Sequence, residues 1–400
     1  AALAALCALA PGLFAQAHWT VDDDGPADFA DVAAAVAAVG AGDVLLVQPG
    51  NYGPVTLTKR LALLGDPSGE RPHLAALTVD GAASFELAHF AVGATVVRDV
   101  PGPSRIDDCE LLGVVQHTGL IVDGAFGLIV QRTRVAPPEL VPTGASAVFV
   151  GGTSVVAIVD SLLEGGDAGA DFANGLEGLG GHGLWVDEQA YVVLSGSSAR
   201  GGDGDDLTGF APGVVAGEGG DGVQAWGGSV IDVRGSSDDE LRGGDRIHWQ
   251  FGPQLDGKAL VAFGAGATYS GVTLVGGTST SFPPLAAPAP HLYVRGTSFL
   301  GGQQRVSFFG PAGATGVVGL SLGQTFTAVP GFEGFLWLSP GALLQVVPLV
   351  LAGQETPANH VWDLPGDASL AGLAALVQGV VVDPLGLLVP TNPAAIVLGF

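Results

Sequence analysis

The chain has 400 residues, of which 48% are hydrophobic and only 13% are charged, so it can bury a large core in one or two domains. It carries 39 acidic against 14 basic residues, and the resulting net charge of −25 disfavours nucleic-acid binding because the protein would repel phosphate backbones. Its 65 glycines and 26 prolines follow no collagen-like period and therefore indicate turns.

Residues 1–17 are interpreted as a truncated secretory signal peptide. The run is rich in Ala and Leu and ends in Ala15-Gln16-Ala17, a small-x-small pattern typical of a cleavage site. A buried N-terminal helix is the alternative. The signal interpretation predicts a secreted protein, extracellular or at the cell surface. No other stretch is long and apolar enough to predict a membrane span.

Residues 18–73 are predicted to form an N-terminal cap and a first coil. Apolar residues recur at helical spacing between Phe29 and Val39, which predicts an amphipathic helix near residues 28–40. Asp28 is the expected N-cap and Gly40 the expected stop. The apolar run 44–47 then predicts a strand that ends at Pro49-Gly50.

Residues 74–310 contain an internal repeat that predicts the fold. Blocks that begin at Gly119, Ala147, Gly183 and Gly222 align without gaps, at spacings of 28, 36 and 39 residues. Constant blocks separated by Gly- and Asp-rich insertions of unequal length are typical of stacked coils with loops on one side. We therefore predict an all-β solenoid, a parallel β-helix.

Alternation within the blocks predicts which side chains face the core. Within each predicted strand, apolar residues stand two positions apart, and the same positions are apolar in all four blocks. This alternation is typical of strands with one buried face. The expected inward columns are Leu120, Val148, Leu184 and Val223; Val122, Val150, Val186 and Ala225; Leu128, Val156, Val192 and Ile231; and Val130, Ile158, Leu194 and Val233.

The entry segment resembles that of the pectate-lyase-like superfamily of right-handed parallel β-helices, which includes secreted bacterial proteins. The likeness rests on the short helix, the following strand and the turn Pro49-Gly50-Asn51-Tyr52. It implies a right-handed β-helix whose open end is covered by the helix.

Residues 311–400 are predicted to form a small C-terminal β module. They are similar to the terminal domains that follow repeats in secreted bacterial proteins. The points of likeness are Ser369-Leu370, Gly372, Gln378, Asp383, Thr391-Asn392 and Gly399.

The outward positions of the repeat suggest a glycan-binding strip. The alignment places Phe149 and Trp185 at one outward position of adjacent coils, with Trp226 two residues along in the next coil. Asp187 and Glu188 lie beside them. Aromatic rings can stack on sugar rings while carboxylates accept hydrogen bonds from hydroxyls. The alternative is that the long loops cover these aromatic residues and make them structural.

A second set of residues would be needed if the chain were an enzyme. The resemblance implies either a polysaccharide lyase, with Arg234 as the base, or a hydrolase with grouped aspartates as acid and base, drawn from Asp232, Asp238 and Asp239. None of the signature catalytic strings of the superfamily is present. A surface ion pair between Asp232 and Arg234 is the alternative interpretation.

No cofactor is predicted, although calcium is possible. Asp203, Asp205 and Asp206 lie in a single partial match to a glycine-rich calcium repeat, whereas a β-roll needs consecutive copies. A solvated Gly-Asp turn is the alternative. No zinc ligands occur at a suitable spacing.

Two classes of function remain open. The first is a secreted, non-catalytic β-helix that binds polysaccharide or a cell-surface glycan, or that has a structural role outside the cell. The second is a carbohydrate-active enzyme, a polysaccharide lyase or glycosidase acting on acidic polysaccharide. We favour the first because the ionisable residues are scattered along the sequence.

Overall fold

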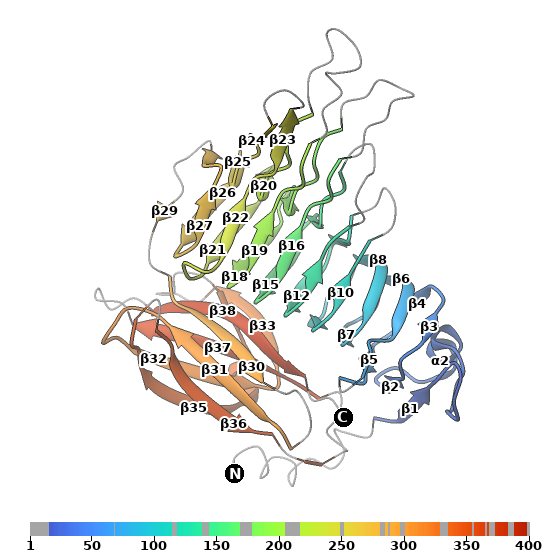
Figure 1. Cartoon of the computed structure of the whole chain (residues 1–400). Coiled ribbons are helices and arrows are strands. Elements are labelled where there is room, and N and C mark those ends of the chain that lie inside the picture. Colours follow the sequence, from blue (N-terminus) through green and yellow to red (C-terminus); the bar gives the residue numbers. More distant parts are fainter. Residues whose placement is uncertain are drawn as a thin grey trace.

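The structure is a computed structural model. It describes residues 16–67, 69–113, 118–137, 144–168, 178–204, 217–248, 252–280, 285–286, 289–296, 301–328, 335–353, 356–364, 366–367, 373–382 and 388–397. These residues form a parallel β-helix followed by a C-terminal module of antiparallel strands, which confirms the predicted fold class (Figure 1). No helix among them is long and apolar enough to cross a membrane.

Each full coil of the β-helix contributes strands to three faces, and each strand pairs in parallel with its counterparts in neighbouring coils. Face 1 contains β1 (His18–Val21), β2 (Val44–Val47), β5 (Leu61–Gly65), β7 (Phe85–Ala88), β9 (Ser104–Asp107), β12 (Phe126–Gln131), β15 (Val155–Val159), β18 (Tyr191–Ser195), β21 (Val230–Arg234), β26 (Gly266–Ser270) and β29 (Leu285–Ala286).

Faces 2 and 3 belong to one branched sheet. Face 2 contains β10 (Glu110–Leu111), β13 (Arg134–Val135), β16 (Leu162–Glu164), β19 (Ser198–Arg200), β22 (Glu240–Arg242) and β27 (Thr273–Val275). Face 3 contains β11 (Leu120–Asp123), β14 (Val148–Gly151), β17 (Leu184–Val186), β20 (Val223–Trp226), β25 (Leu260–Phe263) and β28 (Thr278–Thr280). The two faces merge in the early coils, through β3 (Asn51–Tyr52), β4 (Val55–Leu57), β6 (His73–Asp80) and β8 (Ala91–Arg98).

The register of the repeat agrees with the sequence alignment. Val150 is paired with Val186 on face 3, and Val156 is paired with Val192 on face 1. All the side chains predicted to point inward are buried in one continuous core. Since each column stacks like residues along the solenoid axis, every coil extends the same core.

The N-terminal end of this core is covered by α2 (Val32–Ala38), which is shorter than the predicted helix. Its N-cap is Asp31, whose carboxylate accepts a hydrogen bond from the Ala34 backbone at 2.9 Å. Asp28 instead accepts from the backbone and hydroxyl of Thr20. The helix cannot start earlier because Phe29 forms a parallel β-bridge with Val21, which holds residues 28–30 extended.

Extended glycine segments connect face 2 to face 3 and form what we name the glycine neck: Gly144, Gly165, Gly166, Gly180, Gly181, Gly201, Gly202, Gly219, Gly220, Gly243, Gly244 and Gly257. Backbone hydrogen bonds run across it from coil to coil, for example from Gly202 N to Gly181 O and from Gly220 N to Gly202 O, each at 2.8 Å. A Cβ on Gly202 would lie 2.2 Å from Gly166 O, so only glycine allows this approach. Beyond the neck, β23 (Asp245–His248) and β24 (Gly252–Leu255) form a hairpin.

The C-terminal module consists of antiparallel strands. Its strands are β30 (His291–Gly296), β31 (Gln303–Phe309), β32 (Thr315–Ser321), β33 (Gln324–Ala328), β34 (Phe335–Leu338), β35 (Leu343–Val350), β36 (Ala358–Asp363), β37 (Ala374–Val382) and β38 (Leu388–Val397), with a short 3-10 helix η1 (Pro340–Ala342). β30 and β31 pair antiparallel with each other, so the module begins at His291, earlier than the expected boundary after residue 310.

The module packs against the outer side of face 1 (Figure 1). Ile129, Ala157 and Val193 project outward from β12, β15 and β18 and share a second apolar core with Trp337 and Leu376 of the module. Face 1 is therefore buried on both sides over these coils.

Candidate functional site

The outer side of face 3 carries two pairs of aromatic rings. Phe149 and Trp185 are neighbours in register, with ring centroids 5.3 Å apart in an edge-to-face arrangement. Trp226 and Phe263 are likewise in register in the next two coils, with centroids 5.0 Å apart. A fourth ring, Phe263, therefore extends the predicted strip at the position of Trp226.

The two pairs differ in accessibility. Trp226 is 40% exposed and Phe263 is 37% exposed, whereas Phe149 and Trp185 are half-buried. The indole nitrogen of Trp185 is covered and has no hydrogen-bond partner among the described residues. The pair Trp226–Phe263 thus offers the more open ring surface of the two.

Asp187 and Glu188 lie in the turn that leaves face 3 after β17. Asp187 Oδ1 accepts a hydrogen bond from the Glu188 backbone at 2.6 Å, and Glu188 has the left-handed conformation, with φ of 59°. Asp187 is half-buried and Glu188 is exposed. Asp187 follows Val186, the partner of Ala225, and its carboxylate lies beside Gly227, the residue after Trp226. A carboxylate is therefore placed beside the exposed aromatic pair.

A groove of about 540 Å³ lies beside this pair, between face 3 and the glycine neck. It is lined by Leu179, Gly180, His182, Glu218, Gly219, Asp221, Gln224, Arg246, Asp256, Lys258, Val261, Phe263 and Ser279. Its volume is in the range of small-ligand sites. Phe263 belongs both to the aromatic pair and to the wall of the groove, so the two features form one continuous surface.

A ladder of polar groups runs along the groove from coil to coil. His182 Nδ1 accepts a hydrogen bond from the Asp221 backbone at 3.0 Å, and Asp221 Oδ1 accepts one from the Lys258 backbone at 2.8 Å. Gln224 Nε2 donates to Asp221 Oδ2 at 3.3 Å. His182 and Asp221 thereby each hold the next coil in register, and Gln224 fixes the orientation of the Asp221 carboxylate.

Burial alters the protonation of two members of this ladder. Burial raises the pKa of the Asp221 carboxyl above its ordinary value, and the hydrogen bond from the Lys258 backbone opposes this rise. Burial also lowers the pKa of His182, against the attraction of Asp221. His182 is therefore neutral at pH 7, and since its Nδ1 accepts a hydrogen bond, its proton is on Nε2.

An ion-pair network closes the loop side of the groove. Arg246 Nε lies 2.7 Å from Asp256 Oδ2, and Arg246 Nη2 lies 3.4 Å from Glu218 Oε1. The other oxygen of Asp256 accepts a hydrogen bond from the Gly219 backbone at 2.8 Å. The groove therefore presents acceptors and donors close to an apolar wall.

Sequence reasoning placed Trp185, Trp226 and Asp187 on this surface but missed the groove. His182, Asp221 and Lys258 stand one position before the aligned blocks, so extending the alignment by one residue would have brought them together. Phe263 would have followed from carrying the same alignment one coil further.

The residues named for an enzyme lie elsewhere, on face 1 and its turn to face 2. Arg234 is buried, forms an ion pair with Asp232, and donates a hydrogen bond to Pro290 O at 3.3 Å and a short one to Pro390 O of the module. Burial alone would lower the pKa of Arg234, but the Asp232 carboxylate more than offsets this and holds the pKa above its ordinary value. Arg234 is thus positively charged, and its hydrogen bonds join the β-helix to the module.

The two remaining aspartates of that set also stand apart from the groove. Asp239 accepts hydrogen bonds from the Ser236 backbone at 2.8 Å and from the Tyr293 hydroxyl at 3.2 Å. Asp238 is exposed. None of the four residues lines the groove on face 3.

Of the three possible calcium ligands, only Asp203 lies among the described residues. Asp203 belongs to a ladder in which Asp167 Oδ1 accepts from Asp203 N at 2.7 Å and Asp203 Oδ1 accepts from Asp245 N at 2.8 Å. Burial raises the pKa of Asp203. Asp205 and Asp206 lie outside the described residues. Calcium binding there stays a prediction.

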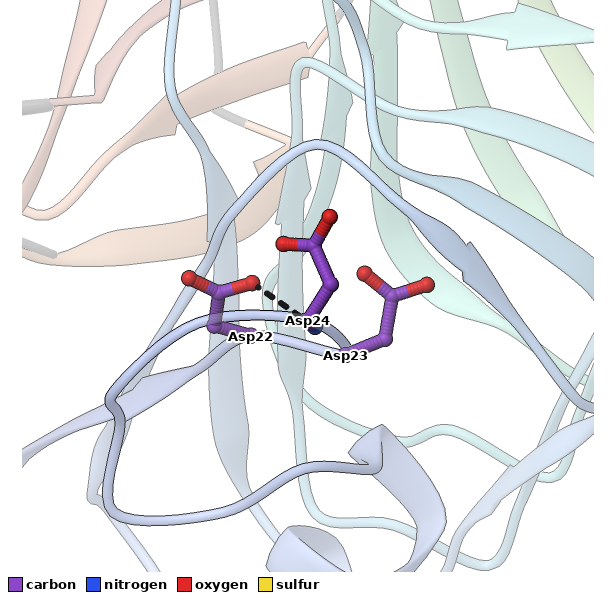
Figure 2. Close-up of side chains that lie close together, drawn as sticks. All are labelled: Asp22, Asp23 and Asp24. Carbon is purple, nitrogen blue, oxygen red and sulfur yellow. Dashed lines mark hydrogen bonds between the residues drawn. The ribbon is translucent and has the colours of Figure 1, made fainter.

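A separate group of carboxylates follows β1. Figure 2 shows Asp22, Asp23 and Asp24 with their carboxylates close together. Asp22 Oδ1 accepts a hydrogen bond from the Asp24 backbone at 3.2 Å, and Asp23 Oδ2 accepts one from Asn51 of the next coil at 3.1 Å. These bonds order the turn, and we assign no ligand to the group.

No protein-family model matches the chain, and no curated protein matches it in sequence. Among solved structures, it is similar to the enzymatically active domain of bacteriophage CBA120 tailspike protein 4, at 9% identity and a TM-score of 0.20 over 89% of this chain and 64% of that one. It is also similar to the tailspike protein gp49 of Acinetobacter baumannii bacteriophage Fri1, a capsular polysaccharide depolymerase, at 8% identity and a TM-score of 0.25 over 96% and 84%. The chain spans just under two thirds of the first structure, and likeness at these scores carries no argument about function. Membership of the pectate-lyase-like superfamily stays a prediction.

Proposed function

We propose that the chain is a non-catalytic polysaccharide-binding β-helix, and that face 3 is its binding surface. The observation that carries this proposal is the exposed pair Trp226–Phe263, held in register by adjacent coils at the wall of the groove. The signal-like residues 1–17 support the proposal that this binding takes place outside the cell, on a secreted or surface glycan.

The chemistry of the surface suits a sugar chain. The apolar face of a pyranose can stack on Trp226 and Phe263, while its hydroxyls need both acceptors and donors. Asp187 and Gln224 supply acceptors, and the exposed Lys258 supplies a donor. Because the solenoid already fixes the spacing of the rings, little conformational entropy is lost when an extended chain binds.

A carbohydrate-active enzyme is the second candidate, and one observation favours it. Asp221 has a raised pKa and lies in the groove with Glu218 and Asp256, which is the kind of setting that general acids occupy. Against catalysis, Asp256 is ion-paired with Arg246, and Asp221 already accepts two hydrogen bonds. These contacts give both carboxylates a structural role.

The test is a glycan array on the purified chain, followed by affinity electrophoresis of variants in the glycan that binds best. Trp226→Ala and Phe263→Ala should each weaken retention at least about tenfold without lowering the melting temperature. Phe126→Ala is the matched control, because Phe126 is 44% exposed but lies on face 1. Equal retention by all three variants would refute the assignment of face 3.

The same glycans distinguish binding from catalysis. Incubation with the wild-type chain should release neither reducing ends nor unsaturated uronate products. If either product accumulates and Asp221→Asn abolishes it, the enzyme is the correct description.

A further inference from the structure

Face 3 turns toward face 1 along an edge that carries mostly acidic side chains. They stand at the ends of successive strands or in the turns that follow, and we name them the acidic edge: Asp80, Asp99, Asp123, Asp187 and Glu188. All are exposed except the half-buried Asp187, and none forms an ion pair with another described residue. Arg98 lies in register between Asp80 and Asp123 and is the basic residue of this edge. The edge therefore has a clear excess of negative charge.

The acidic edge leads to the exposed aromatic pair. The carboxylates lie against glycines in the turns of the next coil: a Cβ on Gly152 would lie 2.6 Å from Asp123 Oδ1, and a Cβ on Gly227 would lie 2.7 Å from Asp187 Oδ1. Gly227 directly follows Trp226. A carboxylate and an exposed indole ring are thus neighbours at the end of the edge.

The charges that line the face 3 groove do not offset this excess. Arg246 forms ion pairs with Glu218 and Asp256. Lys258 is the other basic side chain of the lining, and it interacts electrostatically with Asp221. The lining thus has three carboxylates and two basic side chains, so it gives an anionic ligand no excess of positive charge to bind.

This combination of groups favours one class of sugar. An ammonium group is attracted both to a carboxylate and to the face of an indole ring, while the apolar face of a sugar stacks on an aromatic ring. A uronate is repelled by the acidic edge, and a neutral sugar gains no charge attraction from it. A sugar with a free amino group makes use of the carboxylates and the rings together.

We propose that the polysaccharide bound at face 3 carries free amino groups, which are protonated and contact the acidic edge while sugar rings stack on Trp226 and Phe263. The inference rests on the proposed function and specifies the class of its ligand. The edge extends over several coils, each with a rise of about 4.8 Å. Several amines of one extended chain therefore contact it at once, and the affinity increases with chain length.

The experiment is calorimetric titration of the full chain, just below neutral pH, with a chitosan hexasaccharide, its fully N-acetylated counterpart and a galacturonate hexasaccharide. The first two ligands have the same length and linkage and differ in the charge that acetylation removes. The chitosan hexasaccharide should bind at least about tenfold more tightly than the acetylated one. Raising the salt concentration from about 0.05 M to about 0.5 M should weaken the binding of chitosan alone. Galacturonate should not bind.

Three outcomes overturn the proposal. If the acetylated or the galacturonate hexasaccharide binds as tightly as chitosan and Trp226→Ala abolishes that binding, face 3 binds glycans but does not select amines. If polylysine binds as tightly as chitosan, the surface selects charge rather than sugar. If no glycan binds at all, the proposed function fails together with this inference.

A pair of double variants locates the contact. Asp123→Asn with Glu188→Gln removes two charges from the acidic edge and preserves side-chain size. It should weaken the binding of the chitosan hexasaccharide at least about tenfold without changing the melting temperature. Asp238→Asn with Glu70→Gln is the matched control, because it removes two exposed carboxylates from turns that leave face 1. Equal losses in the two double variants would mean that the net charge of the whole chain attracts chitosan, which also overturns the proposal.

Discussion

Gln131 on β12 and Ala395 on β38 exchange two hydrogen bonds across 264 residues of sequence. Gln131 Nε2 donates to Ala395 O at 2.7 Å, and Ala395 N donates to Gln131 Oε1 at 2.8 Å. Both residues are buried where the module covers face 1. The glutamine side chain thus pairs with the module backbone as another strand would, and it fixes the position of β38 on the β-helix.

Gln131→Ala should therefore loosen the module. The substitution leaves the Ala395 N–H and C=O buried without partners, at a cost of about 2–4 kcal/mol in the free energy of unfolding. Chemical denaturation measures the loss, and limited proteolysis should show earlier cleavage between β-helix and module. Gln303→Ala is the control, since the Gln303 side chain donates to the exposed Asp363 within the module. A change below about 0.5 kcal/mol for Gln131→Ala would contradict the structural role.

The outer side of face 1 shows what sequence reasoning could and could not reach. The inward columns were correct because period-2 alternation depends only on local geometry. The docking of the module was missed, although Ile129, Ala157 and Val193 make these strands almost continuously apolar. Such runs are typical of parallel strands buried on both sides, and that was the available signal.

Other differences arise from contacts between residues far apart in sequence. The helix begins after Asp31 rather than Asp28 because Phe29 pairs with Val21, which helical periodicity cannot reveal. The groove of face 3 joins His182, Asp221 and Lys258 through coil stacking across insertions of variable length. Repeat alignment predicts which residues stack, but it does not predict which stacked residues border a cavity.

The glycine neck should tolerate no side chain. A Cβ on Gly220 would lie 2.0 Å from Gly181 O, a backbone atom that is fixed by its own hydrogen bond from Gly202. Gly220→Ala should lower the free energy of unfolding by about 2 kcal/mol or more. Gly53→Ala is the matched control, because nothing lies within 4 Å of its added Cβ. Equal stability of the two variants, measured by urea denaturation, would mean that the glycine segments are not packed as described.

The inward column of face 1 should not accept a charge. Val192 is completely buried between Val156 and Ile231, so Val192→Asp places an unpaired carboxylate in an apolar core. We expect a loss of more than about 4 kcal/mol, enough to lower expression of folded protein. Val230→Asp makes the same chemical change at an exposed position of the next coil and should cost little. Thermal denaturation of both variants tests the assignment of the column.

Stability should fall in mild acid because of His291, which starts β30 where the module leaves the β-helix. His291 is fully buried and stacks on Phe309, with centroids 4.6 Å apart and rings 7° from parallel. Burial, with a smaller contribution from the positive charge of Arg234, lowers the pKa of His291 from 6.5 to about 4. Between these two values the unfolded chain binds a proton that the folded chain does not. The free energy of unfolding therefore decreases as the pH falls from about 6.5 to about 4.

The contribution of this one histidine approaches about 3 kcal/mol below pH 4, since one pKa unit corresponds to about 1.4 kcal/mol. Asp221 and Asp239, whose pKa values are raised by burial, act in the opposite direction, so the wild-type curve alone does not isolate the histidine. His291→Phe preserves the ring stacking and removes the titrating group. The measurement is urea denaturation of both proteins between pH 4 and pH 8, and the variant should gain stability relative to wild type only as the pH drops below about 6.5. Parallel curves over the whole range would show that His291 takes up its proton equally in the folded and unfolded chain.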